Sequence, residues 1–389
     1  MSQIKDIYLE ICMTSVFRSV LKNPLFVSFM DYATAEKADE KIKAYADMIS
    51  LVYQQGGSLT DAVLRIIFED ENVYIKSRAH GREISPELTR AVEHELSVFE
   101  RLASLTEDSF SLDMGVSYVS PFKSDCRDFS LEYEKRARNI AKHGYGIFAS
   151  YPMFRLENNG LISPIISADK ITLDSFIGYN EERARVIDNT RAFIEGRPSA
   201  NVLLYGDAGT GKSSTVKAVV NAFFDSGVRL IELRKDQLSA LPYVMGRISE
   251  NPLKFIIFID DLSFNKNDDN FSMLKAALEG SASAKADNAV IYATSNRRHI
   301  VRETFDDREG GDVHRNDTMQ EKLSLSERFG LVVMFGKPTK ALYLQIVREL
   351  AARYGIDADE NLDIKAEEFA LRRGNRSARC AEQFIKSLL

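Results

Sequence analysis

Gly-Asp-Ala-Gly-Thr-Gly-Lys-Ser, at residues 206–213, matches the phosphate-binding pattern G-x-x-x-x-G-K-[ST] and is the most specific pattern in this chain. The apolar run before it, 201–205, suits a buried strand, and residues 214–224 after it have the apolar spacing of a helix. A loop that joins a strand to a helix N-terminus can point its backbone N–H groups at phosphate oxygens. The sequence therefore predicts a site for a nucleoside triphosphate.

The residue types in this loop suit the oxygen atoms of a triphosphate. Glycines let the backbone curl so that successive N–H groups point inward. Lys212 can reach the outer phosphates, and the Ser213 hydroxyl can bind Mg²⁺. We therefore expect the nucleotide to be held by Gly206, Asp207, Ala208, Gly209, Thr210, Gly211, Lys212, Ser213 and Ser214.

The composition is that of a globular protein with two or three domains: of 389 residues, 44% are hydrophobic and 28% are charged. The most apolar N-terminal stretch, 11–30, is interrupted by Arg18, Lys22 and Pro24, so we expect neither a secretory signal nor a membrane span. Three scattered cysteines predict reduced thiols and a cytoplasmic protein, and five scattered histidines do not suit a zinc site. The net charge of −6 gives no support to nucleic-acid binding by the whole surface, and leaves open a local basic patch.

Helical patterns dominate residues 1–167, which we expect to form a mostly α-helical domain and a candidate for partner recognition. Its amphipathic segments include 35–54, 60–68, 86–105 and 125–143. A stretch that contains Pro, Gly and Ser, at 158–167, predicts the domain boundary. A locally basic stretch is expected to form a solvated helix face, and the alternative is a surface for nucleic acid or an acidic partner. Its residues are Lys135, Arg136, Arg138, Lys142 and His143.

Apolar runs alternate with helical patterns in residues 168–338. The predicted strands are 202–205, 229–233, 255–259, 289–293 and 331–335. Such alternation is typical of a parallel sheet covered by helices, so we predict an α/β nucleotide-binding domain with a five-stranded parallel sheet. Residues 339–389 have no strand candidate and predict a small helical lid, with helices at 340–354, 364–372 and 377–388.

Polar residues follow two of these strands directly. Asp260 and Asp261 end the apolar strand 255–259, and Asn296 lies just beyond the strand 289–293. Carboxyl ends of parallel strands face the crevice in which α/β sheets bind ligands. Phosphoryl transfer needs one acidic group to hold Mg²⁺ and a second group to orient or deprotonate the attacking water. We predict that Asp260 binds the metal together with Ser213, and that Asp261 orients or deprotonates the water. Asn296 is predicted to hydrogen-bond both a phosphate oxygen and the water.

The order of these motifs resembles that of the AAA+ ATPases. The series consists of the phosphate loop, Asp260 with Asp261, Asn296, the stretch 326–330 and a helical C-terminal lid. Longer stretches resemble the bacterial family catalogued as domain of unknown function 815, over about 171–389; they are 201–214, 260–264, 278–280, 292–299, 323–330 and 376–379. The resemblance implies ATP and Mg²⁺ as ligands and ATP hydrolysis as the activity.

The resemblance also implies roles for residues outside the loop. Arg328 occupies the place of an arginine that reaches the nucleotide of the neighbouring subunit, which implies a homo-oligomer. The lid arginine corresponds to Arg379, with Arg376, one helical turn away, as the alternative. Phe176, Ile177 and Gly178 occupy the place where AAA+ proteins line the adenine pocket.

Two features of the sequence depart from the AAA+ pattern or allow two interpretations. Many AAA+ proteins have Glu in place of Asp261, and the shorter side chain would place the attacking water differently, which predicts slow turnover. Residues 243–246 resemble the aromatic pore loop of protein unfoldases, but Pro242 suits the first turn of a helix and favours a packing role for Tyr243.

Two further stretches have alternative interpretations. Residues 265–268 match the guanine motif N-K-x-D but lie too close to Asp260 for that motif, so a GTPase is not favoured. The charged segment 297–322 is either a partner-contacting loop or a solvated insertion.

The predicted function is ATP hydrolysis with Mg²⁺ that remodels or assembles an unidentified protein partner through a homo-oligomer. The alternatives are an ATP switch similar to DNA replication initiators or helicase loaders, and a slowly hydrolysing, nucleotide-dependent scaffold.

Overall fold

The computed structural model describes residues 3–111, 118–263, 269–278, 286–296, 328–357 and 359–389. The chain divides into two compact units, Met1–Ser150 and Tyr151–Leu389. In the described part of the chain, no helix is both long and apolar enough to cross a membrane.

The first unit is helical. Its α-helices are α1 (Gln3–Cys12), α2 (Pro24–Thr34), α3 (Ala38–Gln54), α4 (Leu59–Phe68), α5 (Val73–Ala79), α6 (Pro86–Ala103), α7 (Glu107–Ser111), α8 (Phe129–Arg138) and α9 (Ile140–His143). Polar side chains accept hydrogen bonds from the first turns of several helices, as Ser58 does for α4 and Ser85 for α6. These caps explain why the helices begin where they do.

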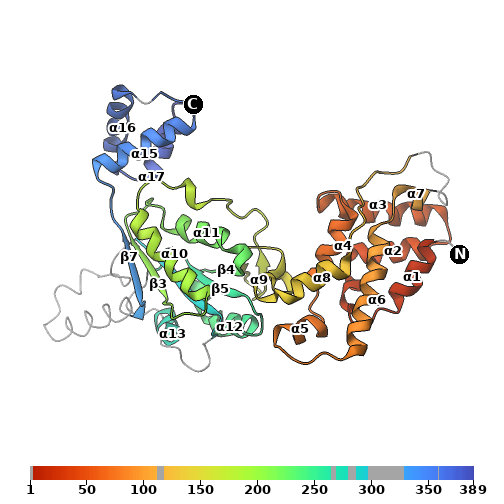
Figure 1. Ribbon diagram of the computed structural model, residues 1–389. Helices are drawn as coiled ribbons and strands as arrows, with labels where there is room; N and C mark the ends of the chain where they lie inside the picture. The colour runs from red at the N-terminus through yellow and green to blue at the C-terminus, as the bar shows by residue number, and fades with distance from the viewer. Residues whose placement is uncertain (1–2, 112–117, 264–268, 279–285, 297–327, 358) are drawn as a thin grey trace. The chain divides into compact units, whose positions relative to one another are not determined.

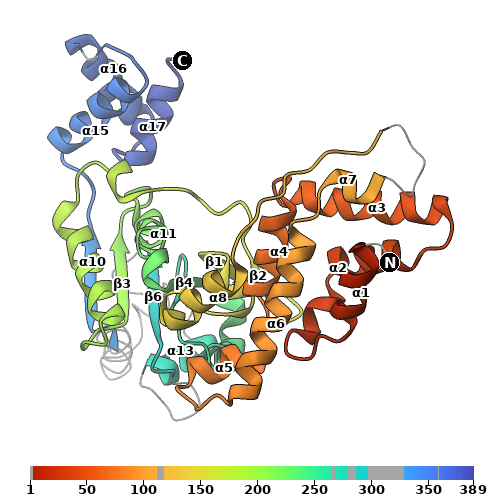
Figure 2. The same cartoon turned by 45° about the vertical axis from the view of Figure 1, so that its right-hand side comes forward.

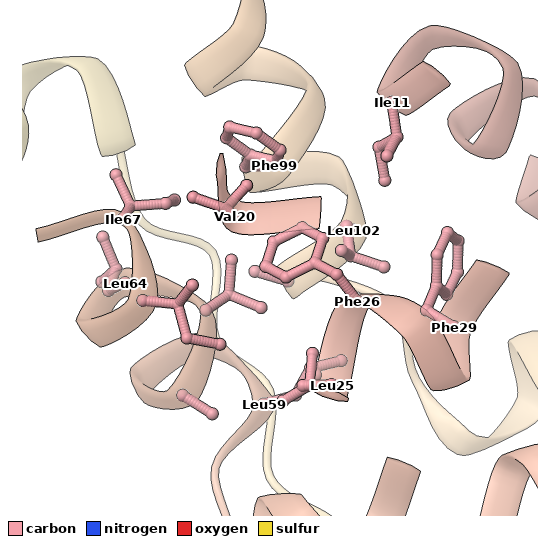
Figure 3. Packing of buried hydrophobic residues seen from close by; sticks show 14 of the residues in the cluster. Ile11, Val20, Leu25, Phe26, Phe29, Leu59, Leu64, Ile67, Phe99 and Leu102 are labelled. Atoms are coloured by element: carbon pink, nitrogen blue, oxygen red, sulfur yellow. The ribbon is translucent and has the colours of Figure 1, made fainter. Parts of the chain in front are cut away.

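The core of this unit joins α2, α4 and α6. Phe26 of α2 and Phe99 of α6 pack edge to face with ring centroids 5.5 Å apart, and Leu64 and Ile67 of α4 belong to the same buried cluster (Figure 3). Apolar burial of this kind stabilises a helical domain without a cofactor.

The described residues of the second unit contain one sheet of seven strands. The strands are β1 (Met153–Leu156), β2 (Ile162–Pro164), β3 (Val202–Gly206), β4 (Val228–Leu233), β5 (Lys254–Ile259), β6 (Ala289–Ser295) and β7 (Leu331–Phe335). Their order across the sheet is β2-β1-β4-β5-β6-β3-β7, and only the β1–β2 pair is antiparallel (Figure 1). The α/β fold with a mostly parallel sheet is confirmed.

The number of strands differs from the prediction of five. The five predicted strands correspond to β3–β7, and the sheet continues through β1 and β2, which lie within the segment assigned to the N-terminal domain. The stretch taken as a domain boundary is instead largely a hairpin: Glu157 N–H donates to the Leu161 carbonyl over 2.8 Å, and Gly160 has φ 82°. For this reason the first unit ends at Ser150 rather than at residue 167.

Helices cover the sheet and follow it. They are α10 (Asn180–Ile194), α11 (Lys212–Ala222), α12 (Leu241–Ser249), α13 (Asp269–Leu278), α15 (Lys340–Arg353), α16 (Glu360–Arg372) and α17 (Ala378–Lys386). Helices α10 and α11 pack against each other beside β3 and β6 (Figure 2). The last three helices follow β7 (Figure 1). They have a core of their own around Tyr343, Ile346 and Phe384.

Candidate nucleotide-binding site

The site lies where β3, β5 and β6 end. Parallel pairing places Ile259 of β5 opposite Ala293 of β6, and Leu204 of β3 opposite Thr294 of β6. Asp260 directly follows β5 and Asn296 directly follows β6, while the phosphate loop leaves β3. Register alone therefore brings the predicted polar residues to one edge of the sheet.

Two glycines give the phosphate loop a backbone that other residues would not adopt. Gly206 has φ 136°, and a Cβ built there would lie 2.0 Å from the Phe335 carbonyl oxygen of β7. Gly211 has φ 92° and is the N-cap residue directly before α11. The loop thus turns sharply between β3 and α11, and the first N–H groups of the helix face outward.

Lys212 is buried and connects three parts of the site. Its Nζ donates to the carbonyl oxygens of Gly206 (2.9 Å) and Asp207 (2.8 Å) and to Asn296 Oδ1 (3.1 Å). Burial lowers the pKa of Lys212, while the charges of Asp207 and Asp260 oppose that shift. The ammonium group of Lys212 therefore lies inside the loop. A phosphate oxygen could replace the carbonyl oxygens of Gly206 and Asp207 as its hydrogen-bond acceptor.

Ser213 and Asp260 form the candidate metal site. Ser213 Oγ donates to Asp260 Oδ1 over 2.6 Å, and the Thr294 hydroxyl donates to the same carboxylate oxygen. The aspartate is exposed, so its second oxygen is accessible. Mg²⁺ takes oxygen ligands and is often bound by one or two protein groups together with phosphates and water. A hydroxyl and a carboxylate side by side fit that ion, and among the described residues no cluster of three or more His, Cys, Asp or Glu suggests another metal site.

Asp261 has an unusual backbone for a residue other than glycine, with φ 51°. Its N–H donates to Thr294 Oγ1 (2.9 Å), and its Oδ1 accepts from Asn296 Nδ2 (2.7 Å). Strained backbone that surrounding contacts hold in place is common at functional sites. The side chains of Lys212, Asn296 and Asp261 consequently form one continuous hydrogen-bonded chain.

A cavity of about 670 Å³ joins these groups to the C-terminal helices. Its polar end contains the phosphate loop, Asp260, Asp261 and Asn296, and its other walls include Phe176, Ile177, Arg183 and side chains of α15 and α17. A volume of this size accommodates a nucleotide. Arg353 of α15 fixes the position of the segment before Phe176, because its Nη1 donates to the Ser175 carbonyl over 2.7 Å.

The remaining predicted nucleotide residues have different surroundings. Ala208, Gly209, Thr210, Gly211, Ser213 and Ser214 line the cavity, as does Ile177. Gly178 is not among the lining residues; a Cβ there would lie 2.4 Å from Leu342 Cδ1, so its small size permits close approach to α15. Gly206 and Asp207 contribute carbonyl oxygens to Lys212.

Two arginines that the sequence left as alternatives have distinct environments. Arg379 lines the cavity, and its backbone N–H donates to the Gly209 carbonyl oxygen over 3.3 Å. Arg376 instead makes two hydrogen bonds to Glu367, of 2.9 and 2.8 Å, and is not a lining residue. The geometry favours Arg379 as the lid arginine.

Arg328 is half-buried and lies just before β7, at the amino end of that strand. The cavity is at the carboxyl ends of the strands, and Arg328 is not among its lining residues. Among the described residues, Arg328 is thus separate from the groups that line this cavity.

Other expectations have mixed outcomes. Tyr243 is 50% exposed because α12 buries Leu241, Val244 and Met245 on another face, so the expected packing role is wrong. The basic stretch is not uniformly solvated, since Arg136 stacks on Phe68 at 4.2 Å from the ring centroid. Residues 265–268 and 297–322 lie outside the described residues.

Sequence reasoning missed Thr294 and Arg183. Thr294 is the last but one residue of β6 and supports both aspartates, a role that its position opposite the end of β5 could have suggested. Arg183 lies on α10 with no motif around it, and the sequence carries no signal for it.

Comparison with known proteins gives one family and several distant structures. The model of a family described as "Protein of unknown function (DUF815)" matches residues 149–389. No protein with a curated description matches the chain. The solved structure of the Thermotoga maritima RuvB Holliday junction branch migration motor is 13% identical, with a TM-score of 0.33, over 57% of this chain and 72% of that one. A point variant of the same RuvB is 15% identical with the same TM-score and coverage. These values are too low to bear on the function of this chain.

Proposed function

The chain belongs to the family described as Protein of unknown function (DUF815), and from this premise we propose that it is an AAA+ ATPase that binds ATP with Mg²⁺ and hydrolyses it. The observation that carries the proposal is the hydrogen-bonded chain from Lys212 through Asn296 to Asp261, beside the pair of Ser213 and Asp260. The lysine proposed to hold phosphate, the carboxylate proposed for the metal and a second carboxylate line one cavity.

Binding would begin at the phosphate loop. The N–H groups at the start of α11 point at the phosphates, and Lys212 exchanges the carbonyls of Gly206 and Asp207 for phosphate oxygens. Ser213 and Asp260 would hold Mg²⁺, which would supply positive charge to the phosphates. Arg379 adds a second cation from the lid formed by α15–α17.

Hydrolysis would use Asp261 and Asn296. A water oxygen attacks the γ-phosphorus, the bond to the β–γ bridging oxygen breaks, and ADP and inorganic phosphate result. Asp261 accepts the proton of the attacking water, and Asn296 orients the carboxylate through its Nδ2 donor. The short side chain of Asp261 and its constrained backbone are also compatible with slow turnover, which is the basis of the scaffold alternative.

We extend the proposal to an oligomer that acts on a protein partner in the cytoplasm. Arg328, at the opposite end of β7 from the cavity, would reach the nucleotide of a neighbouring copy and stabilise the transferring phosphoryl group. The helical unit Met1–Ser150 would recognise the partner to be remodelled or assembled.

The test is phosphate release by the full chain with ATP and Mg²⁺, compared between Lys212→Ala and Lys217→Ala. Both lysines belong to α11, but only Lys212 lines the nucleotide cavity. We expect Lys212→Ala to abolish release and Lys217→Ala to retain it. Undiminished release from Lys212→Ala would refute the proposed function.

A further inference from the structure

Arg183 is a buried arginine in the wall of the nucleotide cavity. Its side chain extends from the first turn of α10, and the residue is only 5% exposed. The guanidinium lies over the Phe176 ring, with Cζ 4.6 Å from the ring centroid. Phe176 in turn borders the phosphate loop, since a Cβ built on Gly211 would lie 3.7 Å from Phe176 Cε1.

The guanidinium of Arg183 has no hydrogen-bond or ion-pair partner within the described residues, although it stacks on Phe176. Burial lowers its pKa to about 10, so the group is still charged at neutral pH. The nearby Glu182 and Tyr179 act to raise its pKa. Leaving a buried charged donor unsatisfied is costly. Nη2 itself has almost no accessible surface, so a ligand in the cavity would meet the guanidinium through the part of Arg183 that lines the wall.

Another buried arginine shows how this chain satisfies such a group elsewhere. Arg229 is 1% exposed and stacks on Phe224 at 4.0 Å, but its Nη1 also donates to two carbonyl oxygens, at 2.9 and 2.8 Å. Arg183 has the equivalent stacking without the carbonyls. The difference suggests that the missing acceptor belongs to a ligand of the cavity.

The surroundings limit what that acceptor can be. Phosphate oxygens are already provided for by the loop, Lys212 and Arg379. Besides these polar groups, the same cavity is lined by Phe176 and by apolar side chains such as Ile177, Ile346 and Leu350, which suit a flat base. A guanidinium only donates, so it selects an acceptor on the base, and purine ring nitrogens are such acceptors.

We propose that Arg183 is a specificity-determining residue that donates a hydrogen bond to an acceptor nitrogen of the purine ring of the bound nucleotide. This inference rests on the proposed function, because it requires a nucleotide in this cavity. Phe176 supports the guanidinium by stacking and keeps its plane against the base.

The experiment measures the affinity of the full chain for ATP and for its 1-deaza, 3-deaza and 7-deaza analogues, each of which lacks one ring nitrogen. We compare the wild type with Arg183→Met and with the control Arg185→Met, an exposed arginine of the same helix. One analogue should bind the wild type and the control about tenfold more weakly than ATP, a typical loss for a charge-assisted hydrogen bond. In Arg183→Met that difference should fall to about twofold or less, while ATP itself binds more weakly.

Several outcomes would overturn the inference. Equal affinity of the wild type for ATP and all three analogues would do so without any variant, even if Arg183→Met failed to fold. A deaza penalty that persists in Arg183→Met would assign a purely structural role to Arg183. In each of these cases ATP still binds the wild type, so the proposed function stands; absence of ATP binding would refute both.

Discussion

Asn296 Nδ2 donates a hydrogen bond to Asp261 Oδ1 over 2.7 Å, and this bond joins the ends of two neighbouring parallel strands. The other side of the same amide accepts from Lys212 Nζ over 3.1 Å. A ligand that draws Lys212 towards phosphate oxygens would remove one of the two partners of Asn296. The carboxylate of Asp261 is thereby connected, through a single amide, to the cation of the phosphate loop.

The first prediction concerns Asp261. We expect Asp261→Asn to bind ATP with unchanged affinity. Its rate of phosphate release should fall at least about a hundredfold, because an amide cannot accept the proton of water. Asp225→Asn, on the exposed turn after α11, is the control and should behave as the wild type. Calorimetry reports binding, and a phosphate assay reports turnover. Normal turnover in Asp261→Asn would exclude Asp261 as the base.

The second prediction concerns Arg328 and the oligomer. Arg328→Ala should bind ATP but hydrolyse it poorly, because the finger acts on a neighbouring site. Mixing Arg328→Ala with Asp261→Asn chains should restore part of the activity, since some sites then combine an intact Asp261 with an intact Arg328. The measurement is phosphate release across mixing ratios, with co-assembly checked by light scattering. Co-assembled mixtures without any recovery would contradict the trans arrangement.

Much of the sheet was predictable because its central strands are apolar runs that end in turn residues. Residues 255–259, for example, are all apolar and stop at Asp260, and the strand begins only one residue earlier, at Lys254. Strands β1 and β2 gave no such signal, because they have four and three residues and Arg155 is an exposed residue in the middle of β1. Such short strands depend on their neighbours in the sheet for hydrogen bonds, and the sequence does not say which strands those neighbours are.

The site was predictable to the extent that it consists of loop and strand ends. Asp260, Asp261 and Asn296 meet because parallel register brings their strands together. The place of Arg183 in the cavity wall depends on how helices pack, and so does the choice between Arg376 and Arg379. Local sequence patterns do not encode this packing. The packing role predicted for Tyr243 was wrong because Pro242 correctly indicated the start of a helix but did not indicate which face of that helix is buried.

The third prediction separates the two lid arginines. Arg379→Ala should weaken ATP binding about tenfold, because a charged donor to phosphate is lost from the cavity. Arg376→Ala should bind ATP normally and unfold at a lower temperature, because Glu367 loses both of its hydrogen bonds to that guanidinium. Calorimetry and thermal unfolding of both variants test the assignment. The opposite pattern would make Arg376 the nucleotide residue.

The fourth prediction is a pH dependence of stability. The hydrogen bonds from Arg376 hold the pKa of Glu367 below its usual range, so the pair stabilises the fold fully above the unfolded pKa of about 4.3. That contribution is lost as pH falls through the lower, folded pKa. The difference in free energy of unfolding between wild type and Arg376→Ala should therefore be present at pH 7 and shrink below about pH 4. Urea unfolding at both pH values measures it, and a constant difference would contradict the ion pair.

The fifth prediction concerns the entry to the phosphate loop. Gly206→Ala places a Cβ 2.0 Å from the Phe335 carbonyl oxygen at a backbone φ of 136°, so it must displace β7 or the loop. Gly196→Ala is the matched control, because its φ is 69° and nothing lies within 4 Å of its Cβ. We expect a loss of about 1 kcal/mol for Gly196→Ala, from backbone strain alone, and about 3 kcal/mol or more for Gly206→Ala. Urea unfolding gives both values. Equal losses would mean that the close approach to Phe335 contributes nothing, and that the glycine is required only for its backbone angle.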